Sequence, residues 1–122
     1  MKYLLMIHTK PGSWAAYSSE EVEKGIAAQN AFNNELFATG ELVGAYGLGE
    51  ADAAKVVRVR AGEPTVTDGP YLEAKEYLAS YCLVDVANEA RALELAAKMP
   101  YAEVAGVEVW PIAHEATPPQ RG

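Results

Sequence analysis

Two segments of this chain are apolar on both faces of an extended strand, which limits the folds open to it. Residues 2–8 and 78–86 are short, mostly apolar runs, and such runs are typical of buried strands. Because successive strand side chains point to opposite faces, each segment has two apolar faces. The alternating positions are Leu4 and Met6 against Leu5 and Ile7, and Tyr81 and Leu83 against Cys82 and Val84. A sheet built from these strands needs apolar cover on both sides.

Two helices are predicted from their end signals. Ser18 followed by Glu21 fits a capping box, and Gly40 suits a left-handed helix stop. Asn88 is a good cap for a second helix, which Pro100 would end. The predicted ranges are 19–39 and 89–98, and the apolar surface of the second helix is assigned to Ala92, Leu93, Leu95, Ala96 and Met99.

The remaining segments predict further strands and an α+β fold. The strands are expected at 41–48, 55–60, 65–67 and 106–112, and the turn at 61–64 makes the second and third a hairpin. The order of elements fits the ferredoxin-like split βαβ arrangement, an antiparallel sheet with both helices on one face. Two such sheets packed face to face in a homodimer would cover the other face. Glycines at 44 and 47 suggest bulges or close backbone approach.

The length, charge and cysteine count of the chain limit the classes of protein to which it can belong. With 122 residues the chain is expected to form one domain over residues 1–113, followed by an arm or disordered tail at 114–122. A formal net charge of −7 argues against nucleic-acid binding, which needs a basic surface. The single cysteine excludes an internal disulfide and suits a reducing cytoplasm. The first apolar run is too short for a signal or membrane segment. We therefore expect a cytoplasmic protein with no nucleic-acid or membrane partner.

The segment 66–76 is predicted to form a sharp corner and has a recognisable sequence. Gly69 permits backbone angles that other residues resist, Pro70 fixes its own φ, and Asp68 can bond the turn amides. A helical turn is expected at 71–76. The segment resembles the signature of the DGPF, or YCII-related, family, with Tyr71 where Phe is usual. Residues 32–36 and 40–44 are similar to the same family. The resemblance spans residues 2 to about 113 and implies a dimeric α+β barrel.

Asp68 and His8 are the candidate catalytic residues. Asp68 either satisfies the amides of its turn or offers a carboxylate as base at the mouth of a pocket. His8 lies at the end of the first apolar strand, where a histidine is commonly a capped or surface residue. Histidine is also a residue type that can both take and give a proton, and His8 lies where a pocket between the sheet and the first helix would open. The resemblance includes Asp68 in the family signature, and a His–Asp pair has been proposed for some YCII-type proteins.

Gln29 and Asn33 fall within the predicted buried stripe of the first helix. At 100° per residue the stripe is defined by Val22, Ile26, Leu36 and Phe37. Buried amides need hydrogen-bond partners, since an unpaired one costs about 1–3 kcal/mol. Gln29 and Asn33 therefore either satisfy each other as a structural pair or line a polar cavity.

Four aromatic residues lie in or beside predicted strands: Tyr46, Tyr71, Tyr81 and Trp110. Aromatic residues in strands usually belong to the core, and the alternative is that they contact a ligand. Tyr46 and Tyr71 are taken as candidate ligand-binding residues together with Asn33 and Gln29. Tyr46 stands where the resemblance leads us to expect an acidic residue, so a mechanism that uses that acid would not carry over to this chain.

No cofactor or metal is expected. His8 and His114 are far apart in sequence, the glycines at 44, 47 and 49 precede no helix, and Cys82 lies within a strand with no partner. The hypothesis is a cofactor-independent small-molecule enzyme of lyase or isomerase type that transfers a proton. The resemblance includes muconolactone isomerase-like and dechlorinating relatives. It also includes members associated with sigma factors, so a non-catalytic ligand-binding or regulatory protein is the alternative.

Overall fold

The computed structural model describes residues 1–10, 16–69 and 76–119. Within these ranges the elements follow one another as β1 (Lys2–Thr9), α1 (Ser19–Thr39), β2 (Leu42–Gly47), η2 (Ala51–Ala53), β3 (Lys55–Arg60), β4 (Glu63–Asp68), β5 (Tyr77–Asp85), α2 (Glu89–Lys98), η3 (Pro100–Glu103) and β6 (Glu108–Pro111). The helical turn expected at 71–76 falls mostly outside the described residues. The predicted helices and strands elsewhere are confirmed, with strand ends shifted by one or two residues.

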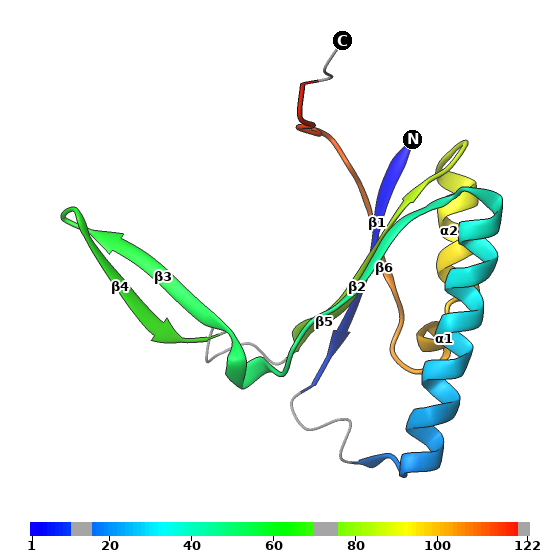
Figure 1. Ribbon diagram of the computed structural model, residues 1–122, viewed down its shortest axis with the longest axis horizontal. Helices are drawn as coiled ribbons and strands as arrows, with labels where there is room; N and C mark the ends of the chain where they lie inside the picture. The colour runs from blue at the N-terminus through cyan, green and yellow to red at the C-terminus, as the bar shows by residue number, and fades with distance from the viewer. Residues whose placement is uncertain (11–15, 70–75, 120–122) are drawn as a thin grey trace.

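Four strands form an antiparallel sheet in the order β2-β5-β1-β6. Both helices cover the same face of this sheet (Figure 1). Strands that are distant in sequence thus become neighbours, because β1 lies between β5 and β6. This is the ferredoxin-like α+β arrangement, and the predicted fold class is confirmed. The predicted irregularity at Gly44 is also present, since the β2–β5 register shifts between Leu42 and Gly44.

The helix ends follow the sequence signals. Ser18 Oγ accepts from the Glu21 N–H at 3.1 Å, while Glu21 Oε1 accepts from the Ser18 N–H at 3.3 Å. Gly40 ends α1 with φ 80°, a left-handed angle that suits glycine. Asn88 Oδ1 accepts from the Arg91 N–H at 2.9 Å and so caps α2. Neither helix, within the described residues, is long and apolar enough to cross a membrane.

The hydrophobic core lies between the helices and the covered face of the sheet. Its buried members are Tyr3, Leu5, Ile7, Phe32, Leu36, Leu42, Cys82, Val84, Val86, Ala92, Leu95, Ala96 and Met99. The predicted stripe of α1 is wrong for Ile26 and Phe37, which are 57% and 53% exposed. The assignment is also wrong for Leu93 of α2, which is 52% exposed. Each helix touches the sheet along a narrower strip than its apolar residues suggest, because one layer covers only one side of a helix.

The other face of the sheet is apolar, and neither α1 nor α2 lies over it (Figure 1). Leu4, Met6, Tyr81 and Leu83 are only half-buried there, while Tyr46 and Trp110 remain 51% and 55% exposed. We call this surface the open face. The described residues therefore leave this face without the second apolar layer that the sequence pattern requires.

The β3–β4 hairpin forms a separate two-stranded sheet. Its strands are joined by a two-residue turn in which Ala61 and Gly62 have φ of 52° and 81°, the pattern of a tight hairpin turn. The hairpin extends on the side of the sheet opposite the helices (Figure 1). At its base, a Cβ added to Gly69 would collide with Val56, which gives the signature glycine a packing reason.

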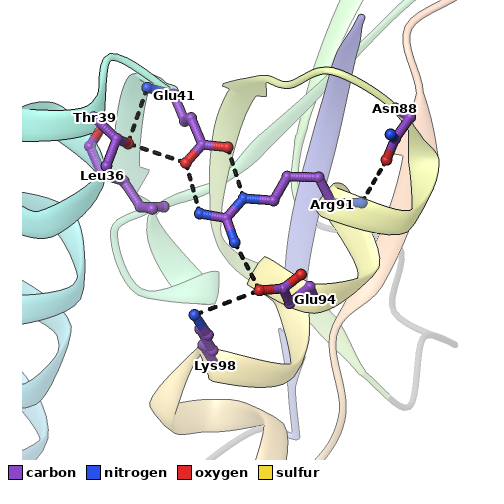
Figure 2. A network of polar contacts seen from close by, with 7 residues as sticks. All are labelled: Leu36, Thr39, Glu41, Asn88, Arg91, Glu94 and Lys98. Atoms are coloured by element: carbon purple, nitrogen blue, oxygen red, sulfur yellow. Dashed lines mark hydrogen bonds and ion pairs between the residues drawn. The ribbon is translucent and has the colours of Figure 1, made fainter.

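A polar network joins the end of α1, the start of β2 and the helix α2 (Figure 2). Arg91 donates from Nε and Nη2 to the two carboxylate oxygens of Glu41, both at 2.8 Å. Thr39 Oγ1 donates to Glu41 at 3.0 Å, and Glu94 accepts from Arg91 at 2.7 Å. Such a two-bond arginine–carboxylate pair fixes geometry as well as charge. It holds the first helix to the second across the edge of the sheet.

Replacing Glu41 by Gln is expected to lower Tm by about 5 °C at pH 7, because bonds to a charged group are lost. Hydrogen bonding from Arg91 holds the pKa of Glu41 below its usual value of 4.5. A depressed carboxyl pKa adds stability above the unfolded-state pKa, and this is lost as pH falls through the folded-state pKa. The Tm difference between the variant and the native chain should therefore shrink below pH 4.5. Calorimetry that finds equal differences at pH 3 and pH 7 would contradict this role.

Candidate functional site

His8 and Glu108 meet where the last strand pairs with the first. Met6 of β1 lies opposite Glu108 of β6, and the β1–β5 register shifts between Ile7 and His8. His8 Nδ1 lies 3.1 Å from Glu108 Oε1. The His8 side chain is 27% exposed and that of Glu108 is 53% exposed. The two side chains thus contact each other, and both are also accessible to solvent.

An open concavity of about 570 Å³ lies beside this pair. It is lined by Met6, His8, Glu76, Glu108 and the segment 105–107. Gly106 has φ 90°, an angle that favours glycine and lets the chain turn here into β6. The wall therefore combines an imidazole and two carboxylates with the apolar side chains of Met6 and Val107.

This composition suits proton transfer. Histidine both accepts and releases a proton near neutral pH, and a carboxylate next to it stabilises the charged imidazolium. No group of three metal-ligating side chains is found among the described residues. Met6 and Val107 offer apolar contact to a small organic molecule.

Asp68 lies elsewhere, at the base of the β3–β4 hairpin, where β4 ends. Its carboxylate accepts a hydrogen bond from Lys55 Nζ, and this partner holds the pKa of Asp68 below its usual range. The Asp68 side chain is 85% exposed and does not line the concavity. Within the described residues His8 contacts Glu108 and Asp68 contacts Lys55, so one chain does not bring the two predicted catalytic residues into contact. Their joint role in catalysis stays a prediction.

Gln29 and Asn33 satisfy one another. Gln29 Nε2 donates to Asn33 Oδ1 at 2.9 Å, and both side chains are half-buried beside Phe32 and Leu36 on α1. They were expected to be buried within the apolar stripe of the helix, and they are only half-buried. The bond fits the alternative in which the two amides form a structural pair, and neither residue lines the concavity.

The aromatic candidates gather on the open face or lie outside the described residues. Tyr46 of β2 packs against Tyr81 with ring centres 5.2 Å apart, and its phenol lies close over Gly44. Tyr71 is outside the described residues. Cys82 is buried in the core, as predicted, and burial raises the pKa of its thiol to about 11.

Sequence reasoning missed Glu108 and Glu76. A signal for Glu108 was present, since alternation places it on the same face of the last strand as Trp110. In a ferredoxin-like sheet the last strand pairs with the first, so an acid near the start of the one faces the end of the other. Glu76 carries no such signal, because its place depends on how the chain enters β5.

Comparisons with known proteins agree with the fold. Residues 1–115 match the model of the YCII-related domain. The chain is 31% identical over 115 residues to an uncharacterised protein of Rhizobium meliloti (strain 1021), covering 93% of each chain. It is similar in structure to TftG, a 5-chloro-2-hydroxyhydroquinone dehydrochlorinase from Burkholderia phenoliruptrix AC1100, solved with 2,5-dihydroxybenzoquinone. That likeness has a TM-score of 0.54 at 15% identity and covers 94% of this chain and 96% of TftG.

Proposed function

The chain belongs to the YCII-related family, and from this premise we propose that it is a cofactor-independent enzyme that moves a proton on a small molecule. The observation that carries the proposal is the contact between His8 and Glu108 at the wall of the concavity. A histidine beside a carboxylate, open to solvent and next to apolar contact surface, suits general acid–base catalysis of a lyase or isomerase type.

In this proposal His8 takes a proton from the bound molecule and returns it at another atom or to the leaving group. The carboxylate of Glu108, 3.1 Å from Nδ1, stabilises the imidazolium formed in between. With Nδ1 turned toward Glu108, Nε2 is the nitrogen left to exchange the proton with the substrate. Glu76 on the same wall supplies a second carboxylate for a hydroxyl or amine of the substrate.

A hydroxylated ring is a sensible first probe. The structural neighbour TftG is described as a dehydrochlorinase in complex with 2,5-dihydroxybenzoquinone. Such a ring has exchangeable protons and a flat apolar body, which matches the mixed wall of the concavity. In this reading Tyr46, Tyr71, Gln29 and Asn33 remain proposed ligand contacts, and Asp68 remains a proposed second acid–base group.

Proton transfer can be measured without knowing the natural substrate. We expect 2,5-dihydroxybenzoquinone in D2O to exchange its ring hydrogens faster with the native protein than with heat-denatured protein, as followed by NMR. The same compound is expected to raise Tm, because a ligand that binds only the folded state stabilises it. A raised Tm without faster exchange favours a ligand-binding protein instead. If the compound neither raises Tm nor exchanges its ring hydrogens faster with the native protein, this substrate class is rejected.

The proposed enzyme is a cytoplasmic homodimer that packs its open faces together. The support is the set of half-buried and exposed apolar side chains on that face, among them Trp110 at 55% exposure. An uncovered apolar sheet face commonly marks an interaction surface. A C2 dimer would pair this face with itself and supply the missing layer.

A further inference from the structure

The β3–β4 hairpin has an apolar side that is exposed in the part of the chain that the structure describes. Val57, Val59 and Val66 are 63%, 66% and 63% exposed. Val57 pairs with Val66 and Val59 pairs with Pro64, so all four lie together on one face of the hairpin. We call this surface the valine face. It is a second uncovered apolar surface, distinct from the open face of the main sheet.

A hairpin of this kind gains little from its own contacts. An isolated two-stranded hairpin is at best marginally stable in water, and further packing on an apolar face is what stabilises it. Exposed β-branched residues on a free strand also invite association with another chain. The valine face therefore points to a surface that is covered when the protein is assembled.

The position of the hairpin indicates where the cover comes from. It extends on the side of the sheet opposite the helices, which is the side of the open face (Figure 1). A second copy seated on the open face would lie on the same side as the hairpin. The two uncovered apolar surfaces of one chain can then be covered by the same partner molecule.

Charge favours the same partner. The hairpin has a net charge of +1, whereas the whole chain has −7. Its charged residues are Lys55, Arg58 and Arg60, against Glu63 and Asp68. A weakly positive arm is attracted to a strongly acidic surface, and a second copy of this chain offers one.

We propose that the β3–β4 hairpin is an arm that packs its valine face on a second copy of this chain, beside the paired open faces. The proposal rests on the homodimer proposed above and adds to it a second contact. In a symmetric dimer each arm reaches the same surface of the other copy, so the pair of arms clasps the assembly. The arm then contributes to the dimer's affinity separately from the sheet.

A matched pair of variants tests the arm. Val66→Glu places a carboxylate on the valine face, and Thr67→Glu places the same charge one residue away on the opposite face of the hairpin. Both side chains are exposed, so neither change removes a buried contact. Sedimentation equilibrium is expected to show a dimer dissociation constant raised at least tenfold by Val66→Glu and less than threefold by Thr67→Glu. The conservative pair Val57→Thr and Val66→Thr, made together, should weaken the dimer in the same direction.

The outcomes separate the arm from the dimer itself. A native chain that stays monomeric at 100 µM overturns both proposals. A native dimer that Trp110→Ser weakens and Val66→Glu does not leaves the sheet interface standing and removes the arm. Equal weakening by Val66→Glu and Thr67→Glu also removes it, since only added charge would then matter. Circular dichroism of each variant verifies that the fold is retained.

Discussion

Replacing Leu95 by Ala is expected to lower the free energy of unfolding by about 2–5 kcal/mol, the usual cost of such a truncation in a packed core. Leu95 is 1% exposed on α2, and it belongs to the core that joins this helix to the sheet. Its removal leaves a cavity that the stiff neighbouring strands fill poorly. For a chain of this size the corresponding fall in Tm is about 10 °C or more.

The same helix supplies the control. Leu93 is 52% exposed, so Leu93→Ala removes the same atoms from a site that loses little burial. Its Tm should change by less than about 2 °C. Both variants are compared by calorimetry at one protein concentration, because self-association makes Tm depend on concentration. Equal losses for the two leucines would mean that Leu93 is buried in the assembled protein.

Replacing His8 by Asn is expected to reduce the protein-dependent exchange of ring hydrogens in 2,5-dihydroxybenzoquinone by about 100-fold or more. Loss of a general acid–base group commonly costs this much or more, and His8 is the residue proposed to carry the proton. Asparagine keeps hydrogen-bonding ability and cannot take the proton, so binding measured by the rise in Tm should fall much less than the exchange rate. Glu108→Gln should also slow exchange, by a smaller factor, since it removes only the charge that stabilises the imidazolium.

The second histidine gives a matched control for this experiment. His114 is exposed and does not line the concavity, so His114→Asn should leave exchange unchanged. Asp68→Asn tests the remaining predicted acid–base group in the same assay. Exchange that survives in His8→Asn would remove His8 from the mechanism, and exchange lost only in Asp68→Asn would place the chemistry at the hairpin.

Much of the fold could be predicted because its signals are local. The capping box at Ser18 and the left-handed Gly40 fix the ends of α1, and Asn88 fixes the start of α2. The exposure of Ile26 and Phe37 was not predictable in this way. Both are apolar residues on a helix with apolar residues around much of its circumference, and only the position of the sheet decides which side is covered.

The candidate site shows the same division. His8 was recognisable from its chemistry and its place near the end of an apolar strand. Its partner was not, because Glu108 is 100 residues away and reaches His8 through the pairing of β1 with β6. Asp68 was singled out by the Asp-Gly-Pro segment that it begins, yet its ion-pair partner is Lys55, on the neighbouring strand of the hairpin.

The sequence by itself determined the elements, their order, the family and the need for apolar cover on both faces of the sheet. These follow from short-range preferences and from the alternation of side chains along a strand. Only the tertiary structure decided that Glu108 stands beside His8 and that the hairpin leaves the sheet as a separate arm. Such contacts depend on strand register and on the direction in which a hairpin leaves its sheet, and neither is encoded within any one segment of the chain.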